Sequence, residues 1–418
     1  MSFESLVGDI TGRGRAASAR TAELRSDVKA AALLRIADRL EEASAELIAA
    51  NALDLQASRA AGLEGPMLER LALDAARITG MAAGVRDVAA LADPVGEVTS
   101  MWDRPSGLQV GRMRIPLGVV LIIYESRPTV TADAAALCLK SGNATILRGG
   151  KEALHSNRAI AAIIRTALRE GGVPEDAVQL VPDPAREILD LLLEREDEID
   201  LVVPRGGEAL IRRVSERSRI PVIKHYKGVC HVYLDEHADP KMARDIAINS
   251  KCQRVSVCNS AETLLVHASL ADTLLPGLVS ELRDLGVEVR ACERTRSRCP
   301  DTVAAREADW SEEYLSMTLA VRVVDSLDDA IDHIRRYGSD HTESIVTENV
   351  RRAHEFVRRV NSSSVFVNAS TRFSDGFELG LGAEIGVSTT KLHWFGPMGI
   401  EGLTTQKFIA FGDGTLKE

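Results

Sequence analysis

The chain has 418 residues, a hydrophobic fraction of 45% and a formal net charge of -10. This length exceeds the size at which one hydrophobic core stops growing, so we expect two large lobes. The acidic balance argues against nucleic acid as a main partner, because phosphate binding needs a basic surface. The N-terminal segment is polar, and the longest apolar run, from Ile115 to Tyr124, has ten residues, too short to cross a bilayer. We therefore expect a cytoplasmic protein with no membrane partner.

The cysteines and histidines argue against a disulfide framework and a metal centre. None of the six cysteines forms a C-x-x-C pair, and the nine histidines show no metal-ligand spacing such as H-E-x-x-H. Without an export signal, the cysteines are best interpreted as reduced thiols. We expect no metal site.

The first part of the chain is predicted to be helical and then to form a hairpin. Apolar residues recur at helical spacing from Ser26 to Ala61, and a second helical stretch covers Pro66 to Leu91. The segment from Val95 to Arg114 then alternates between apolar and polar residues, with a turn at Pro105 to Gly107. This pattern predicts a two-stranded excursion.

The remainder alternates between short strands and helices, which predicts parallel sheets with helices on both faces. The first series of strands is expected at 118–123, 144–147, 178–181, 201–203 and 221–223, with helices at 153–170 and 184–194 among them. A second series is expected at 230–234, 263–266, 287–290, 319–324 and 344–346. The fold class is therefore α/β, with two lobes in tandem.

Two glycine turns are candidates for phosphate binding, although no G-x-G-x-x-G follows a predicted strand. The turn Arg205-Gly206-Gly207 lies between a predicted strand and a predicted helix, where backbone can approach a phosphate closely. The turn Arg148-Gly149-Gly150-Lys151 also follows a strand and carries two cations, which suits an anion such as the 2′-phosphate of NADP. An ordinary βα turn and a solvated charged turn are the alternatives.

Cys258 is the candidate nucleophile. A helical run ends near Cys252 and an apolar run begins at Glu262, so Cys258 is expected on the loop between them. Lys251 and Arg254 lie close in sequence and would favour the reactive thiolate. The alternative is a small buried hydrophobic residue, which is what most cysteines are.

Several segments together resemble the gamma-glutamyl phosphate reductases, also called glutamate-5-semialdehyde dehydrogenases, which form a family within the aldehyde dehydrogenase superfamily. The matching segments are 115–129 (IPLGVVLIIYESRPT), 133–158, 204–212 (PRGGEALIR), 221–237, 337–350 and 368–406. The resemblance implies an aldehyde dehydrogenase-like fold. In it, 1–95 and 115–227 form the NADP-binding lobe, 228–395 the catalytic lobe, and 96–114 with 396–418 a small β-hairpin oligomerisation element and C-terminal segment.

The resemblance also implies a reaction. L-glutamyl 5-phosphate would be reduced by NADPH to L-glutamate 5-semialdehyde with release of phosphate, the second step of proline biosynthesis. The thiolate of Cys258 would attack the acyl carbon and form a thioester. A homo-oligomer and a functional association with glutamate 5-kinase are also expected of this family.

Roles are carried over to matching positions only. The predicted catalytic residues are Cys258 as nucleophile, with the backbone at Cys258 and Asn259 and the side chain of Ser126 as oxyanion donors. The predicted cofactor-binding residues are Arg148, Lys151, Gly206, Gly207 and Glu313, the last for the nicotinamide ribose. The predicted substrate-binding residues are Arg127, Arg254, Arg372 and His341, since arginines bind anions and His341 could donate a proton. A structural role is the alternative for Glu313 and for His341.

The chain departs from the family pattern at Cys252, where threonine is usual, and at Val255, where proline is usual. It also has His225-Tyr-Lys-Gly228 where hydrolytic members of the superfamily carry Glu-Leu-Gly-Gly, whose glutamate activates water. An enzyme that transfers its thioester to phosphate must not lose it to water. Two alternatives remain, namely a hydrolytic aldehyde dehydrogenase of the same fold and a non-catalytic scaffold.

Overall fold

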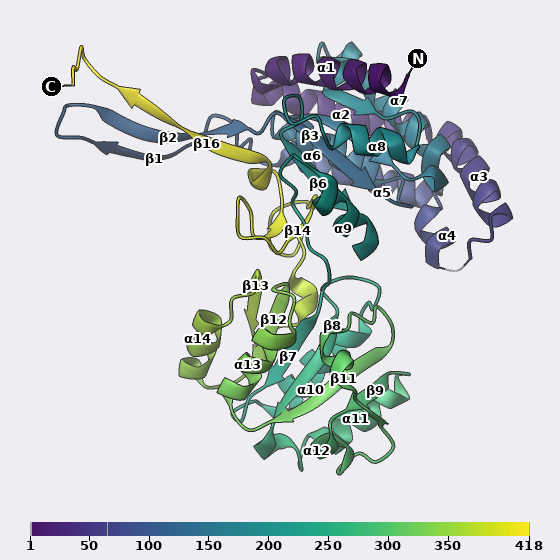
Figure 1. Cartoon of the computed structure of the whole chain (residues 1–418), viewed down its shortest axis with the longest axis vertical. Coiled ribbons are helices and arrows are strands. Elements are labelled where there is room, and N and C mark those ends of the chain that lie inside the picture. The colour runs from purple at the N-terminus through teal and green to yellow at the C-terminus, as the bar shows by residue number, and fades with distance from the viewer. Residues whose placement is uncertain (1, 65, 418) are drawn as a thin grey trace. The chain divides into compact units, whose positions relative to one another are not determined.

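The computed structural model describes residues 2–64 and 66–417, which divide into two units (Figure 1). The first unit comprises Met1–Lys224, Leu381–Gly386 and Met398–Glu418, and the second comprises His225–Gly380 and Val387–Pro397. The predicted hairpin and the C-terminal segment are thus grouped with the first unit. Within the described ranges, no helix is both long and apolar enough to span a membrane.

Helices form the N-terminal part of the first unit. They are α1 (Phe3–Ala22), α2 (Ser26–Glu42), α3 (Ser44–Ala60), α4 (Pro66–Leu71) and α5 (Ala75–Ala90). The helical pattern predicted from Ser26 to Ala61 is confirmed, and it is divided into two helices by a turn at Ala43. Both α2 and α3 pack on α7 (Leu154–Glu170). The second predicted helix is also divided. Asn51 bonds to the backbone of Leu71 and Leu73, and Asp74 caps the N-terminus of α5 by accepting from Arg77 N.

A four-stranded parallel sheet forms the centre of the first unit. Its order is β5-β4-β3-β6, with β3 at Val119–Tyr124, β4 at Ala144–Gly149, β5 at Val178–Leu180 and β6 at Leu201–Arg205. Among the helices that connect and follow these strands are α6 (Val130–Lys140), α8 (Arg186–Leu192) and α9 (Glu208–Arg217). Every residue of β3 is buried, as the continuous apolar run predicts. The expected strand at 221–223 is reduced to one bridge between Val202 and Val222.

The predicted excursion is confirmed as an antiparallel sheet of β1 (Val98–Asp103), β2 (Gln109–Pro116) and β16 (Thr404–Phe411), in the order β1-β2-β16. Figure 1 shows it extending from the rest of the first unit. The strand β16 was not expected from its sequence. It exists because residues near the C-terminus pair along the whole of β2.

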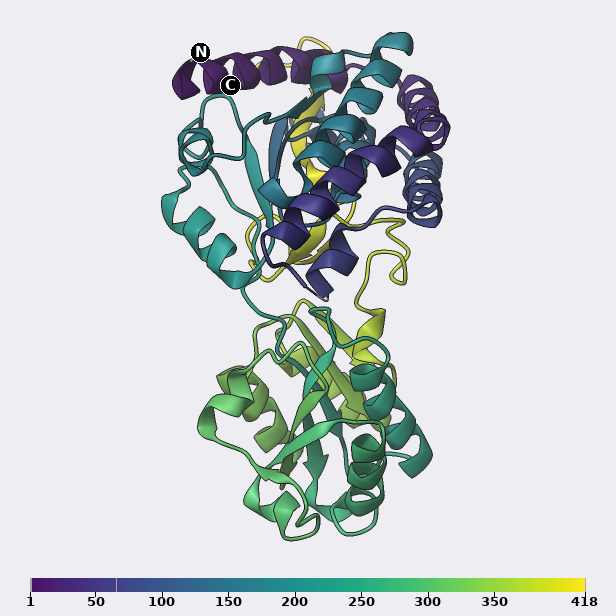
Figure 2. The same cartoon turned by 90° about the vertical axis from the view of Figure 1, so that its right-hand side faces the viewer.

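The second unit contains a seven-stranded sheet whose named pairs are parallel, in the order β10-β9-β11-β8-β7-β12-β13 (Figure 2). Its strands are β7 (Cys230–Leu234), β8 (Ala261–His267), β9 (Glu288–Ala291), β10 (Val303–Ala304), β11 (Thr318–Val324), β12 (Thr342–Val346) and β13 (Ser364–Val367). Its helices are α10 (Pro240–Cys252), α11 (Leu275–Asp284), α12 (Glu293–Arg296), α13 (Leu327–Tyr337) and α14 (Val350–Arg359). The short strands β14 (Gly386–Ser388) and β15 (Gly396–Met398) pair with each other.

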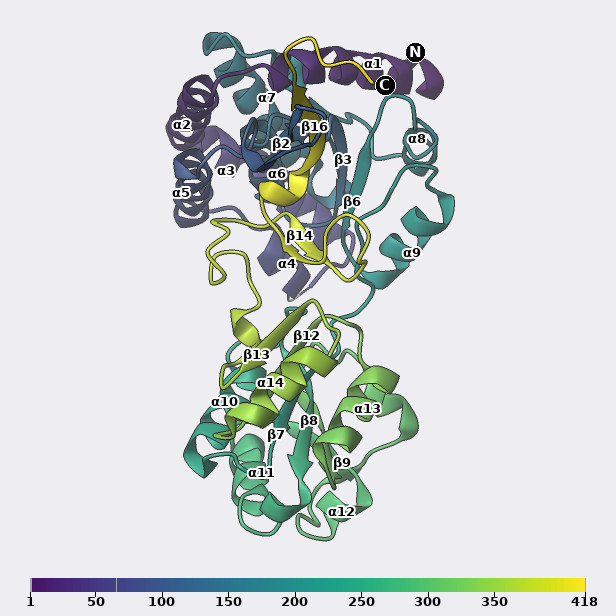
Figure 3. The ribbon, with the colours of Figure 1, turned by 90° about the vertical axis from the view of Figure 1, so that its left-hand side faces the viewer.

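Helices cover both faces of this sheet (Figure 3). Along β7, Val232 and Leu234 enter a core with α10 and α11, whereas Tyr233 enters a second core with α13 and α14. This alternation follows from the period of two in a strand. Short 3-10 helices occur at Lys151–Ala153, Glu175–Ala177, Ala268–Leu270, Glu307–Ser311, Thr371–Phe373 and Glu401–Leu403.

Candidate functional site

The loop that carries Cys258 lies where the sequence predicts it. Helix α10 begins with Asp239, whose carboxylate accepts from Met242 N, and ends at Cys252; strand β8 begins at Ala261. Cys258 is half-buried between them. Cys258 is therefore on a loop outside the regular sheet, in a position from which a side chain can reach a ligand.

Gly228 packs directly against the Cys258 backbone. A Cβ added at Gly228 would lie 2.0 Å from the carbonyl oxygen of Cys258 and 2.8 Å from its Cα. The Gly228 N–H donates to Glu313 Oε1 at 2.9 Å, and the next N–H, of Val229, donates to Ser339 Oγ at 2.8 Å. Only glycine fits here, so position 228 fixes how closely these two segments approach.

Cys230 holds the same carbonyl group from within the core. Its Sγ donates to the Cys258 carbonyl oxygen at 3.1 Å and lies 3.7 Å from His341 Nδ1. Burial raises the pKa of Cys230 well above its usual value, and the nearby Glu343 and Cys258 raise it further. Cys230 is therefore a protonated donor and not a second nucleophile.

Arg372 links to the loop on both sides of Cys258. Its Nε donates to Gln253 Oε1 at 2.9 Å, its Nη1 donates to Asn259 Oδ1, and Asn259 Nδ2 donates to the Ser374 carbonyl at 2.9 Å. Burial lowers the pKa of Arg372, and the charge of Arg254 lowers it further. Because an arginine stays charged even so, a guanidinium is held beside the nucleophile loop.

Lys251 does not act as the sequence analysis expected. Its Nζ lies 2.6 Å from Glu262 Oε2, and both side chains are fully buried. Burial lowers the pKa of Lys251 and raises that of Glu262. The pair carries no net charge to the loop, so Arg254 and Arg372 are the cations that remain in this region. Its structural effect is to connect the end of α10 with the start of β8, on either side of Cys258.

His341 and Glu313 both face groups of the protein. His341 is fully buried, with Nδ1 2.8 Å from Thr342 Oγ1. The Glu313 carboxylate accepts from Gly228 N. These contacts fit the structural alternatives, and the roles of His341 toward substrate and of Glu313 toward the nicotinamide ribose stay predictions.

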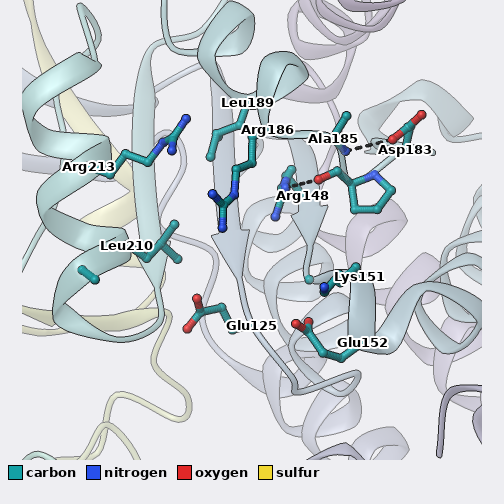
Figure 4. Close-up of a pocket in the computed structure, with 13 residues that line it drawn as sticks. Glu125, Arg148, Lys151, Glu152, Asp183, Ala185, Arg186, Leu189, Leu210 and Arg213 are labelled. Atoms are coloured by element: carbon teal, nitrogen blue, oxygen red, sulfur yellow. Dashed lines mark hydrogen bonds between the residues drawn. The ribbon is translucent and has the colours of Figure 1, made fainter. Parts of the chain in front are cut away.

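The first unit contains a cavity of about 750 Å³ at the carboxyl ends of β4 and β6 (Figure 4). Arg148 and Lys151, predicted from sequence, line it together with Arg186 and Arg213, which sequence reasoning missed. Carboxylates line it as well, from Glu125, Glu152 and Asp183. The sequence offered one signal for Arg186: it lies shortly after a predicted strand and in the first turn of a predicted helix, at the start of what becomes α8.

Gly206 and Gly207 begin helix α9, whose Ala209 and Leu210 line the cavity. The N–H of Gly207 donates to Glu125 Oε2 at 3.1 Å. A Cβ at Gly206 would lie 2.5 Å from the same oxygen. The first turn of α9 thus already binds an anionic oxygen, as expected of a helix N-terminus. A large cavity lined by cations next to a helix N-terminus fits a dinucleotide.

Ser126 and Arg127 follow β3 in the first unit. Ser126 is buried and has a φ of 41°, a left-handed conformation that is uncommon for a residue other than glycine and is found often at functional loops. Arg127 is exposed. These two residues belong to the first unit, whereas Cys258, Asn259, Arg254 and Arg372 belong to the second. Among the described residues, no group of three or more His, Cys, Asp or Glu side chains could hold a metal ion.

Comparison with known proteins identifies the family. A model of the aldehyde dehydrogenase family matches residues 7–297. The chain is 55% identical to a gamma-glutamyl phosphate reductase of Geotalea daltonii and 54% identical to one of Geobacter metallireducens, in each case over 100% of both chains. The crystal structure of a gamma-glutamyl phosphate reductase from Thermotoga maritima has a TM-score of 0.97 and 43% identity, covering 99% of this chain and 100% of that one.

The chain belongs to the gamma-glutamyl phosphate reductases, within the aldehyde dehydrogenase family. The predicted fold class and enzyme class are therefore confirmed, and the enzyme uses a nicotinamide dinucleotide. Family membership makes the first-unit cavity the candidate dinucleotide site and the Cys258 loop the candidate site of covalent chemistry. The roles of the individual residues are not set by the comparisons.

Proposed function

We propose that the chain reduces L-glutamyl 5-phosphate to L-glutamate 5-semialdehyde with NADPH, through a thioester on Cys258. The reductase activity follows from membership of the family. The thioester intermediate, the use of NADPH and the roles of the individual residues are our proposal. The observation that carries it is the Cys258 loop. It presents a half-buried thiol beside the cation of Arg372, and the backbone N–H groups of Cys258 and Asn259 donate to no group among the described residues.

Cys258 begins the reaction by attacking the acyl carbon, and the C–O bond to phosphate breaks. Arg254 and Arg372 are well suited to neutralise the leaving phosphate, since guanidinium groups bind phosphate through paired donors. The product of this step is a thioester on Cys258 and free phosphate.

The oxyanion of each tetrahedral species needs donors. The side chain of Asn259 is occupied by Arg372 and by the Ser374 carbonyl. The proposed donors are therefore the backbone N–H groups of Cys258 and Asn259. Ser126 is proposed as a further donor from the family resemblance alone. After reduction, the resulting thiohemiacetal of Cys258 collapses, which releases the aldehyde and returns the thiolate.

The dinucleotide would be held in the first unit by Arg148, Lys151, Gly206 and Gly207. The role of Glu313 toward the nicotinamide ribose is proposed from the family resemblance alone. When bound, its reduced nicotinamide supplies the hydride. The excess of cations at one end of the cavity favours the phosphorylated form, NADP, over NAD. Arg127 and His341 are further proposed substrate contacts, from their place in segments that match the family.

His225 supports phosphate transfer over hydrolysis. It stands where hydrolytic members of the superfamily have their water-activating glutamate, and its Nδ1 lies 3.0 Å from the Val387 carbonyl oxygen. The carboxylate that serves as the base in hydrolytic members is therefore missing from this position. The thioester should therefore persist until phosphate attacks it.

In the oxidative direction, turnover of glutamate semialdehyde and NADP is expected to require inorganic phosphate or arsenate. We expect at least a hundredfold lower steady-state rate without either anion, about the contribution of a missing general base. The measurement is NADPH absorbance against phosphate concentration, with sulfate as the ionic-strength control. Equal rates with phosphate and with sulfate would favour the hydrolytic alternative.

We further propose a homo-oligomer assembled through the sheet of β1, β2 and β16, functional association with glutamate 5-kinase, and a cytoplasmic location. For the oligomer, the support is a group of exposed apolar side chains on that sheet, at Val98, Met101, Trp102, Phe408 and Phe411. Exposed apolar groups of this kind are common at interfaces.

A further inference from the structure

We propose that Arg186, assisted by Arg213, is the residue that selects NADPH over NADH by binding the 2′-phosphate, in place of the Arg148 suggested by sequence. This inference rests on the proposed function and names the specificity determinant of its cofactor site. It starts from three guanidinium groups that line one cavity, from β4, α8 and α9 (Figure 4).

Arg148 is already committed to the protein. Its Nη2 donates to the Pro184 carbonyl, and its side chain is half-buried. Burial lowers the pKa of Arg148, and the charges of Glu152 and Glu125 oppose that effect. A guanidinium in this situation fixes the segment before α8 and has fewer donors left for a ligand.

Arg186, unlike Arg148, is not bonded to another group among the residues that the structure describes. Its side chain is exposed and forms no hydrogen bond or ion pair with any residue in the described part of the chain. Figure 4 shows its guanidinium pointing into the cavity, between Arg148 and Arg213. All five of its N–H donors are available, which suits a phosphate group.

The backbone beneath Arg186 is nevertheless well anchored. Asp183 Oδ1 accepts from Ala185 N at 2.8 Å, and the α8 residues Ile188, Leu189 and Leu192 are buried in the core of the first unit. The backbone is therefore already fixed, and only the side chain of Arg186 has to be ordered when a ligand binds.

Arg213 adds a second cation that is only partly neutralised. It donates from one nitrogen, Nη2, to both carboxylate oxygens of Asp190, at 2.9 and 3.1 Å. Across the cavity lie Glu125 and Glu152 (Figure 4). One end of the cavity is therefore cationic, with Arg148, Arg186 and Arg213, whereas at the other end Lys151 lies beside Glu152. A phosphomonoester, with a charge near -2 at neutral pH, matches the cationic end, whereas a ribose hydroxyl leaves Arg186 without an anion.

Binding of two fragments to the full chain tests this assignment. The probes are 2′,5′-ADP, which carries the 2′-phosphate, and 5′-AMP, which lacks it, each titrated by calorimetry. The variants are Arg186→Ala, Arg148→Ala and, as the control, Arg212→Ala, an exposed arginine of α9 that does not line the cavity and pairs with Glu208. Circular dichroism checks that each variant is folded.

Arg186→Ala should weaken the binding of 2′,5′-ADP by about ten- to a hundredfold, the range for one charged hydrogen bond. It should change the affinity for 5′-AMP by no more than about twofold. Arg148→Ala should weaken the binding of both fragments by similar factors. Arg212→Ala should leave the affinity for both fragments unchanged. Arg186→Lys should recover part of the lost affinity, because the charge is kept. Equal losses of both fragments in Arg186→Ala, or no loss of either, would overturn the inference.

Inorganic phosphate is the third probe, since the same cations could instead hold the phosphate of the acyl substrate. If phosphate binds as tightly as 2′,5′-ADP and depends equally on Arg186, the assignment to the cofactor is wrong. Failure of the wild-type chain to bind either nucleotide would overturn the proposed cofactor site as well as this inference. Intact NADPH binding with no effect of Arg186→Ala would overturn this inference alone.

Discussion

Cys258→Ala should abolish reduction of the acyl phosphate while NADPH binding stays within about twofold of wild type. The thiol forms the covalent bond to substrate, and its removal takes away the reaction path rather than a ground-state contact. The residual rate is expected to fall by at least about 10⁴-fold, as for other catalytic nucleophiles. Stopped-flow measurement of NADPH oxidation and fluorescence titration of NADPH separate the two effects.

Cys252→Thr is the matched control, because it changes the other thiol near this loop. Cys252 is at the end of α10 and lines a separate cavity with residues that include Arg244 and Glu281. Burial raises the pKa of the Cys252 thiol, which disfavours the thiolate. This variant should keep most of the activity. An inactive Cys252→Thr beside an active Cys258→Ala would show that the nucleophile has been misassigned.

Gly228→Ala should reduce kcat by about a hundredfold or more, with NADPH binding in the first unit unchanged. The added methyl group would occupy the place of the Cys258 carbonyl, 2.0 Å away, so one of the two backbone segments must shift. Displacing a reacting group by about 1 Å can cost about a hundredfold in rate. Steady-state kinetics with the acyl phosphate, together with thermal unfolding, measures the effect.

Gly277→Ala provides the control for a glycine-to-alanine change in the same unit. Gly277 lies in helix α11, and a Cβ there would have no atom within 4 Å. We expect unchanged kinetics and a melting temperature equal to or above that of wild type, because alanine favours helix by about 1 kcal/mol over glycine. Similar kinetics for Gly228→Ala and Gly277→Ala would mean that Gly228 does not position the nucleophile.

The sequence predicted the elements whose pattern is local. Strand β7 is found at the expected residues, and the Cys258 loop lies between the expected helix and strand. Two other features depend on distant partners. The run Thr404–Phe411 becomes strand β16 only by pairing with β2, and the bend at Ala43 lets α2 and α3 both reach α7. Helix α1 was missed because its sequence contains the helix-disfavouring Gly8, Gly12 and Gly14, although Val7 and Ile10 are buried.

The same distinction applies to the site. Cys258 could be found from its place between two elements and from the family motif. The packing of Gly228 and Cys230 on its carbonyl joins β7 to the loop over a long stretch of chain, and no local pattern reports that. Sequence proximity also misled for Lys251, whose charge is taken by Glu262. Likewise, neither the Pro184 carbonyl that binds Arg148 nor the exposure of Arg186 can be read from adjacent residues.

The most direct test of the thioester is mass spectrometry of the enzyme after one turnover in the oxidative direction. The enzyme is mixed with glutamate semialdehyde and NADP in the absence of phosphate, quenched in acid and digested. We predict one equivalent of NADPH and a mass increase of one glutamyl group on the peptide that contains Cys258, lost again when phosphate is added before quenching. An unmodified Cys258 peptide alongside continued NADPH formation, or a glutamyl group on Cys252 instead, would contradict the account.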